Sequence, residues 1–145
     1  MTGSETQPEG RDAPARIVIA DDHGLVRQGF RGMLAREGDL EVVGEAEDGR
    51  EAVEACSRLR PDLVLMDVRM PGMDGLEATR EIKQRHPRTI VLMVTMHENP
   101  DYLVEAVRAG AAGYVLKGSP NSQIVSSVRR ALEGESPSTR SSPCT

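Results

Sequence analysis

Five short apolar runs alternate along this chain with five segments in which apolar residues recur every three or four positions. The runs consist mostly of Val, Ile, Leu and Met, which is typical of strands that are covered on both faces of a parallel sheet. The alternation predicts βαβ units, in which each helix carries the chain back to the start of the next parallel strand. The predicted strands are Arg16 to Ala20, Glu41 to Ala46, Asp62 to Met66, Thr89 to Val94 and Gly113 to Leu116.

The segments between and after these runs predict five helices, each with one apolar stripe buried against the sheet. Pro61 and Pro87 fall between a helical segment and the next strand, where a missing amide donor ends a helix at little cost. Gly110 is expected to cap the fourth helix at its C-terminus. The predicted stripes are Val26, Phe30, Met33 and Leu34, then Val53, Cys56 and Leu59, then Leu76 and Ile82, then Leu103, Ala106 and Val107, and finally Ile124, Val125, Val128 and Leu132.

The length of the chain suits one domain with one hydrophobic core, because it has 145 residues of which 38% are hydrophobic. We expect the folded domain to span residues 15–134. Residues 1–14 and 135–145 are rich in Gly, Pro, Ser and Glu and poor in apolar residues, which indicates a disordered tail at each end.

The composition argues against two classes of function. The formal net charge is -5, which does not favour binding to DNA, so a nucleic-acid role would need another domain. No apolar stretch approaches the roughly 20 residues of a membrane span, and the N-terminus lacks the basic and then apolar pattern of a secretory signal. We therefore expect a cytoplasmic protein that makes no membrane contact.

Five polar residues stand where the predicted strands stop. Asp21 and Asp22 follow the first strand, Asp67 the third, Thr95 the fourth and Lys117 the fifth. Right-handed crossovers commonly arrange five parallel strands in the flavodoxin-like order 2-1-3-4-5, which makes strands one, three, four and five contiguous. Because ligands bind at the carboxyl ends of such strands, these side chains are expected to converge on one site.

Carboxylates, a hydroxyl and an ammonium group at one edge indicate metal and phosphate chemistry. Mg²⁺ prefers oxygen ligands, and Asp22 and Asp67 suit it, with Asp21 nearby. Without a cation, mutual repulsion is expected to raise the pKa of at least one of these carboxylates. Asp67 is the predicted nucleophile for an aspartyl-phosphate because it ends the central strand. Lys117 and Thr95 are predicted to contact phosphoryl oxygens only after phosphate arrives.

Each of these residues also has an ordinary structural interpretation. Asp22 could be the N-cap of the helix that begins near Gly24. Asp67 could simply begin a turn, Thr95 is a common kind of strand residue, and Lys117 could be a solvated surface charge. Their coincidence at the ends of the strands favours the functional interpretation.

Four motifs resemble the receiver domains of two-component response regulators, the CheY-like proteins. The resemblance lies in the acidic pair of IVIADDHGLVRQGF, the segment DLVLMDVRMPGMDGLE, the Thr of VLMVTMH and the Lys of AAGYVLKG, and it runs from about Arg16 to Glu133. It implies an α/β, flavodoxin-like fold: a doubly wound sheet of five parallel strands in the order 2-1-3-4-5, with five helices. The chain would be a signalling switch and not a turnover enzyme.

The resemblance implies a role for each residue of the predicted site. Asp67 would accept a phosphoryl group from a histidine of a sensor histidine kinase. Mg²⁺, or Mn²⁺, would be held by Asp22, Asp67 and the main-chain carbonyl of Arg69, with Asp21 helping through a water molecule. Lys117 would bind a phosphoryl oxygen.

The same resemblance implies how the signal would leave the site. Thr95 and Tyr114 would form a switch pair, in which the hydroxyl moves toward the phosphoryl group and the ring turns inward behind it. His97 is a candidate for the mouth of the site. Gly118 stands where many receivers have a cis-proline after the lysine, which leaves the geometry of that loop open.

The segments DDHGLVRQGF and AGAAGYVLKGSP are most similar to the NarL/FixJ subfamily. Its members usually carry a LuxR-type helix-turn-helix domain, through which they contact DNA and regulate transcription. That domain is absent from this chain, so residues 135–145 would be a flexible tail or the start of a linker. Arg108, Arg129 and Arg130 are candidates for the contacts of a homodimer.

Two other functions compete with a phosphorylation switch. A phosphatase similar to the haloacid dehalogenases would usually have a second Asp two residues after the nucleophile, but Arg69 occupies that place. A stand-alone or phosphorylation-independent receiver would act as a protein interaction module. The complete set of acids together with Thr95 and Lys117 argues against it, because such receivers typically lose part of the set.

Overall fold

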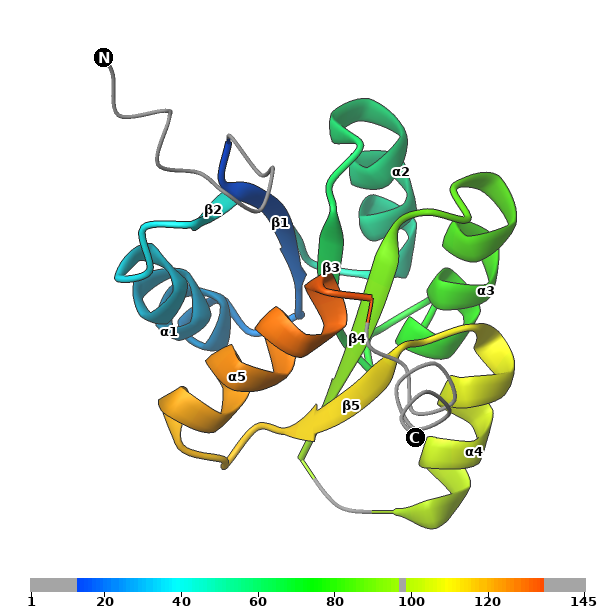
Figure 1. Ribbon diagram of the computed structural model, residues 1–145. Coiled ribbons are helices and arrows are strands. Elements are labelled where there is room, and N and C mark those ends of the chain that lie inside the picture. Colours follow the sequence, from blue (N-terminus) through cyan, green and yellow to red (C-terminus); the bar gives the residue numbers. More distant parts are fainter. Residues whose placement is uncertain (1–12, 97–98, 135–145) are drawn as a thin grey trace, which may run out of the picture.

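Five parallel strands form one sheet in the order β2-β1-β3-β4-β5, which confirms the predicted topology (Figure 1). The computed structural model describes residues 13–96 and 99–134, so the predicted tails lie outside the described residues except for Ala13 and Pro14. The strands are β1 (Ala15–Ala20), β2 (Leu40–Ala46), β3 (Leu63–Asp67), β4 (Ile90–Thr95) and β5 (Gly113–Leu116).

The third and fourth strands begin and end one residue later than the apolar runs predicted. Asp67 is therefore the last residue of β3, and Thr95 is the last residue of β4. The reason is the parallel register, in which Asp67 still pairs with Val94 and Thr95 still pairs with Leu116. Both polar side chains thus start from backbone that the sheet itself holds in place.

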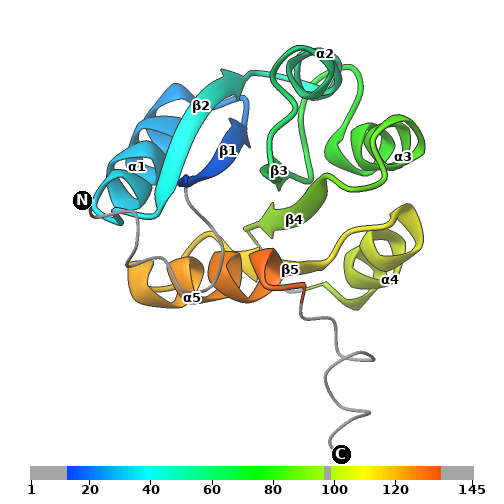
Figure 2. The ribbon, with the colours of Figure 1, turned by 45° about the horizontal axis from the view of Figure 1, so that its top comes forward.

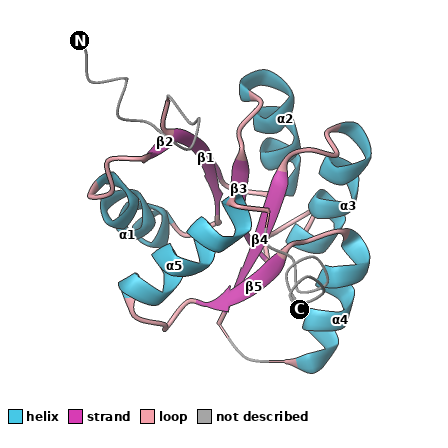
Figure 3. Ribbon diagram, viewed as in Figure 1, coloured by secondary structure: helices cyan, strands magenta, loops and turns pink. Residues whose placement is uncertain are grey.

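Each helix connects or follows a strand, as Figure 3 shows, and the helices cover both faces of the sheet (Figure 2). Helices α1 and α5 lie on one face, and α2, α3 and α4 lie on the other. No helix within the described ranges has the length and apolar content needed to span a membrane. The helices are α1 (Gly24–Ala35), α2 (Gly49–Leu59), α3 (Gly75–Arg85), α4 (Pro100–Ala109) and α5 (Asn121–Leu132).

Alternate residues of each central strand enter two different cores. In β1, Ile17 and Ile19 pack with α1 and α5, whereas Val18 packs with α2. In β3, Leu65 and Met66 divide in the same way. Because side chains alternate across a strand and both faces are covered, every position must be apolar, which explains the unbroken runs.

The helices after β2, β3 and β4 begin at a capping side chain. Asp48, Asp74 and Asn99 each accept a hydrogen bond from a main-chain N–H of the first turn. Helix α1 begins differently, because its N-cap residue is His23 and makes no side-chain cap. The alternative interpretation of Asp22 as the N-cap of α1 is therefore wrong, which leaves its carboxylate available to the site.

Helix α4 departs from the predicted buried stripe. Leu103 is 36% exposed and Val107 is 60% exposed, while Ala106 and Ala109 are buried. The small alanine side chains make the contact with the sheet, so the larger apolar residues face outward. The predicted cap is confirmed, since Gly110 has a φ of 106° and its N–H bonds to the last turn of the helix.

Candidate functional site

The structure brings the three carboxylates together at the carboxyl edge of the sheet. Asp21 and Asp22 extend from β1, and Asp67 ends β3, which lies directly beside β1. One oxygen from each carboxylate and a ring nitrogen of His23 all lie within 4.8 Å of one another. Asp21 is only 1% exposed and Asp67 is also buried, so two of the three charges are withdrawn from water.

Lys117 reaches this cluster from the end of β5. Its Nζ atom lies 2.9 Å from Oδ2 of Asp21 and 3.3 Å from Oδ2 of Asp67, and its side chain is 10% exposed. Lys117 therefore already contacts two carboxylates without phosphate, which the sequence did not predict, and its contact with a phosphoryl oxygen stays a prediction. In the absence of another cation, the ammonium group is the charge that offsets the two buried carboxylates.

The environment shifts the pKa of two of these groups in the same direction. Burial raises the pKa of Asp67, the negative charge of Asp21 raises it further, and Lys117 and the main-chain N–H of Arg69 oppose the shift. For Lys117, burial lowers the pKa, but the attraction of Asp21 and Asp67 outweighs burial and raises it overall. The expected raised pKa of at least one carboxylate is confirmed at Asp67.

The raised pKa of Asp67 predicts that Asp67→Asn stabilises the metal-free protein. When the folded-state pKa lies above the unfolded value, the native state binds the proton more tightly, and the free energy of unfolding falls as the pH rises through that range. The neutral amide avoids this cost and still accepts hydrogen bonds. We expect the free energy of unfolding of Asp67→Asn to be higher by about 1 kcal/mol near neutral pH, measured by urea unfolding without divalent ions.

The pH dependence provides the internal control for this variant. Well below the ordinary pKa of 3.8 the carboxyl group is protonated in both states, so the two proteins should have similar unfolding free energies. Asp101→Asn, at an exposed position of α4, should differ little from the unmodified chain at any pH. A variant at Asp67 that is less stable near neutral pH would contradict the prediction.

The donor set fits a hard divalent cation. Carboxylate oxygens are the ligands such ions prefer, and three of them converge here. Oδ2 of Asp21 is buried and accepts no hydrogen bond from the described residues, so its contact is the ion pair with Lys117. The cluster can therefore hold a metal ion that takes over part of the neutralising role of the lysine.

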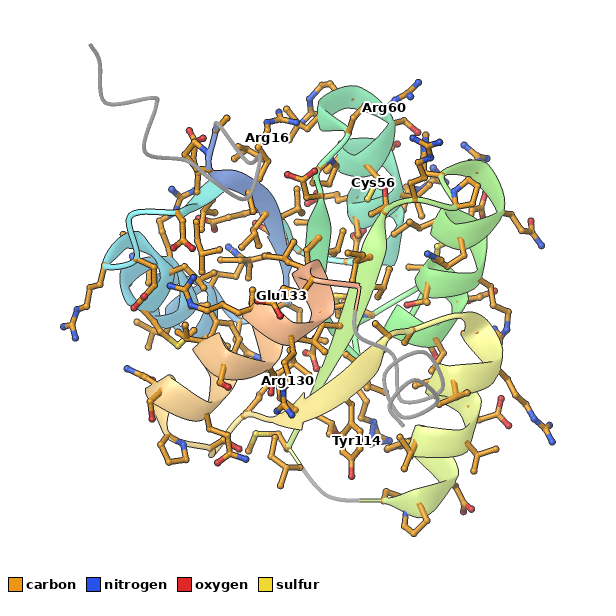
Figure 4. All side chains as sticks on the ribbon, in the orientation of Figure 1. Arg16, Cys56, Arg60, Tyr114, Arg130 and Glu133 are labelled. Atoms are coloured by element: carbon orange, nitrogen blue, oxygen red, sulfur yellow. The ribbon has the colours of Figure 1, made fainter. Side chains whose placement is uncertain are left out.

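The predicted switch residues lie on the two strands beyond Asp67. Thr95 is buried at the end of β4. Tyr114 lies in β5 (Figure 4), is half-buried, and packs against the core on the face that α4 covers. The N–H of Lys117 donates to the carbonyl of Thr95 at 2.8 Å, which ties the loop before Gly118 to β4. His97 lies outside the described residues.

The sequence motifs did not indicate two residues that hold the site in place. Gly75, the first residue of α3, approaches Asp67 so closely that a Cβ atom there would lie 2.0 Å from its carbonyl oxygen. Arg27 of α1 donates from Nη1 to the carbonyl oxygen of Asp21 at 2.6 Å. Both residues lie within the motif segments, Gly75 directly after the capping Asp74 and Arg27 six residues after Asp21, but the sequence assigned them no role.

One of the three arginines considered for a homodimer contact forms ion pairs within the chain. Arg129 of α5 forms ion pairs with Glu37 and Asp39, in the connection between α1 and β2. It therefore fastens α5 to the rest of this face.

Comparisons with known proteins agree with this architecture. The family model described as "Response regulator receiver domain" matches residues 17–129. The response regulator GacA of Pseudomonas viridiflava is 43% identical over 120 residues, which are 83% of this chain and 56% of that protein. The transcriptional regulatory protein DegU of Brevibacillus brevis is 40% identical over 119 residues, 82% of this chain and 50% of that protein.

A solved structure extends the likeness to three dimensions. The two-component response regulator of the LuxR family from Aurantimonas sp. SI85-9A1 superposes with a TM-score of 0.81 at 39% identity, covering 87% of this chain and 92% of that chain. The chain spans about half the length of the curated relatives that it matches. Fold, site and relatives together place this chain in the response regulator receiver domain family, among the receivers of NarL/LuxR-type regulators.

Proposed function

We propose that Asp67 accepts a phosphoryl group from a histidine of a sensor histidine kinase and that the aspartyl-phosphate switches an output. The observation that carries this proposal is the buried carboxylate of Asp67 beside Asp21, with Lys117 offsetting their charges. An oxygen of Asp67 attacks the phosphorus atom, and the bond from phosphorus to the kinase imidazole breaks. The imidazole nitrogen keeps the electron pair of that bond.

The metal in this proposal is Mg²⁺, or Mn²⁺. Asp22, Asp67 and the main-chain carbonyl of Arg69 would hold it, with Asp21 acting through water. When bound, the ion supplies charge neutralisation to the phosphoryl group. The exposed position of Asp22, next to the buried Asp21 and Asp67, supports its role as the carboxylate that meets an incoming ion.

The contacts of Lys117 with two carboxylates suggest how this lysine responds to phosphate. Its contact with Asp67 is the longer one, at 3.3 Å against 2.9 Å to Asp21. Once Asp67 is esterified, Lys117 keeps Asp21 and turns to a phosphoryl oxygen. Thr95 donates its hydroxyl to a second phosphoryl oxygen, and Tyr114 follows by turning inward toward the space that Thr95 leaves.

The proposed partners follow from the same switch. They are the sensor kinase, and either a second copy of this chain or an output domain of the LuxR helix-turn-helix type that would contact DNA and regulate transcription. The outward-facing apolar side chains of α4, Leu103, Val104 and Val107, support a partner surface on this side of the molecule. Exposed apolar side chains that cluster on one helix are a common mark of such surfaces.

The proposal predicts that acetyl phosphate with Mg²⁺ adds one phosphoryl group to this chain and none to Asp67→Asn. The intact mass, measured soon after mixing because acyl phosphates hydrolyse, reports the modification. Asp101→Asn is the matched control and should be modified as the unmodified chain is, since Asp101 lies in the first turn of α4.

Equal labelling of the Asp67→Asn variant would show that another residue is the acceptor. No labelling of the unmodified chain, together with no binding of a divalent ion, would favour the phosphorylation-independent interaction module. Steady release of phosphate from a phosphomonoester would instead favour the phosphatase.

A further inference from the structure

Arg27 connects the acidic loop to the edge of the sheet. It lies in α1 and is 15% exposed, although it carries a full charge. Its Nη1 atom donates to the carbonyl oxygen of Asp21 at 2.6 Å, and its Nε atom donates to Oε1 of Glu45 at 2.8 Å. A third nitrogen, Nη2, lies 3.8 Å from a carboxylate oxygen of Glu47.

The carbonyl that Arg27 binds belongs to the peptide unit that joins Asp21 to Asp22. A peptide unit is planar, so fixing its oxygen also fixes the direction in which the Cα atom of Asp22 leaves it. The preceding N–H of Asp21 is held separately, because it donates to the carbonyl of Ala46 at 3.0 Å. The sheet therefore holds the N–H of Asp21, and Arg27 holds its carbonyl, from which the chain continues to Asp22.

Glu45 holds the guanidinium group in the required orientation. Its carboxylate accepts hydrogen bonds from both Arg27 and Arg31, one on each oxygen. The hydrogen bond from Arg31 is the main cause of the lowered pKa of Glu45, and Arg27 adds to it, so Glu45 stays ionised over a wide pH range. Arg31 shares this anchor with Arg27 but has no contact with Asp21 among its described interactions.

We propose that Arg27 is a positioning residue of the metal site, which orients the Asp21–Asp22 peptide so that the carboxylate of Asp22 is presented to the divalent cation. The inference rests on the proposed function, because it assumes that the acidic cluster binds a cation. Outer partners that orient metal ligands typically change metal affinity by about 10- to 100-fold when they are removed. If Arg27 only connected α1 to β2, its removal would lower stability and leave metal affinity unchanged.

The test compares Mn²⁺ binding by the 145-residue chain and three variants, with the free ion followed by electron paramagnetic resonance. Arg27→Met is expected to bind Mn²⁺ about 10-fold more weakly, because the Asp21–Asp22 peptide loses its donor. Arg31→Met, which loses a bond to the same Glu45, should bind within about twofold of the unmodified chain. The Mn²⁺ affinity of Arg27→Lys should lie between those of the other two variants, because one ammonium group cannot donate to both partners in the geometry of a guanidinium group.

A second readout separates positioning from a loss of folding. Labelling by acetyl phosphate at saturating Mn²⁺ should reach the same extent in Arg27→Met as in the unmodified chain, while the Mn²⁺ concentration for half-maximal labelling rises. If Arg27→Met fails to fold, Arg27→Lys carries the test. Equal affinities of the Arg27 and Arg31 variants would overturn the inference alone, whereas absence of Mn²⁺ binding by the unmodified chain would overturn both it and the proposed metal site.

Discussion

Lys117→Met is expected to lower the free energy of unfolding of the metal-free protein by about 3 kcal/mol near neutral pH. The ammonium group of Lys117 lies within ion-pair distance of Asp21 and Asp67, and both carboxylates are buried. Removing one partner of a buried ion pair leaves the other charge uncompensated, and here two charges of the same sign would remain. Urea unfolding in the presence of a chelator measures the loss.

The loss in this variant should depend on pH and on divalent ions. Without Lys117, Asp67 loses the attraction that opposes its raised pKa, so it takes up a proton as the pH falls and the deficit in unfolding free energy shrinks. Adding Mg²⁺ should restore more stability to the variant than to the unmodified chain, because the ion replaces the missing charge. Binding to the folded state alone at a hundred times the dissociation constant contributes about 2.7 kcal/mol.

Lys83→Met provides the matched control. Lys83 is also partly buried, but its Nζ atom donates to the carbonyl oxygens of Pro87 and Thr89, which carry no charge. Lys83→Met should lower the free energy of unfolding by about 1 kcal/mol, and Mg²⁺ should not change this loss. Equal losses in the two lysine variants, both unaffected by Mg²⁺, would show that the charge balance at the acidic site is not what Lys117 provides.

Lys117 also shows where sequence reasoning about the site stops. Its position after an apolar run was enough to place it at the same edge as Asp21 and Asp67, because parallel strands bring their carboxyl ends together. Its state before phosphate arrives, paired with both carboxylates, was not predicted. That state depends on the net charge of the assembled cluster, which a linear pattern of residue types does not contain.

The fold was more predictable than the surfaces of its helices. Both faces of β1 and β3 are covered, so their apolar runs mark the strands directly, with errors of one residue at the ends. Helix α4 carries an apolar pattern that packing uses only in part, since its alanines face the sheet while Leu103 and Val107 do not. Periodicity alone cannot distinguish apolar residues that contact the sheet from apolar residues that stay exposed.

Arg27 and Gly75 were missed for a different reason. The partner of Arg27 on β2, Glu45, is 18 residues away, and the contact exists only because α1 packs beside β2. Gly75 matters because of the backbone of another element, with no side-chain chemistry of its own. Both residues lie inside the motif segments, but a motif does not show what they contact, and only the assembled structure identifies these contacts.

Gly75→Ala is expected to destabilise the protein by about 3 kcal/mol and to slow phosphorylation of Asp67. A Cβ atom at this position would lie 2.0 Å from the carbonyl oxygen of Asp67 and 2.9 Å from its carbonyl carbon, both of them main-chain atoms of β3. Strand backbone cannot yield as a flexible side chain can, so α3 must move away and weaken the hydrogen bond from Gly75 to the carbonyl of Val68. Urea unfolding and the rate of labelling by acetyl phosphate measure the two effects.

Gly32→Ala separates this collision from the general effect of replacing glycine. Gly32 lies inside α1, is exposed, and has no heavy atom within 4 Å of an added Cβ. Alanine is favoured over glycine in a helix by about 1 kcal/mol, so this variant should gain stability and label normally. The two substitutions are chemically identical, so opposite signs would locate the effect in the contact between α3 and Asp67. A stable Gly75→Ala variant with normal labelling would mean that α3 can move away without displacing Asp67, the proposed phosphoryl acceptor.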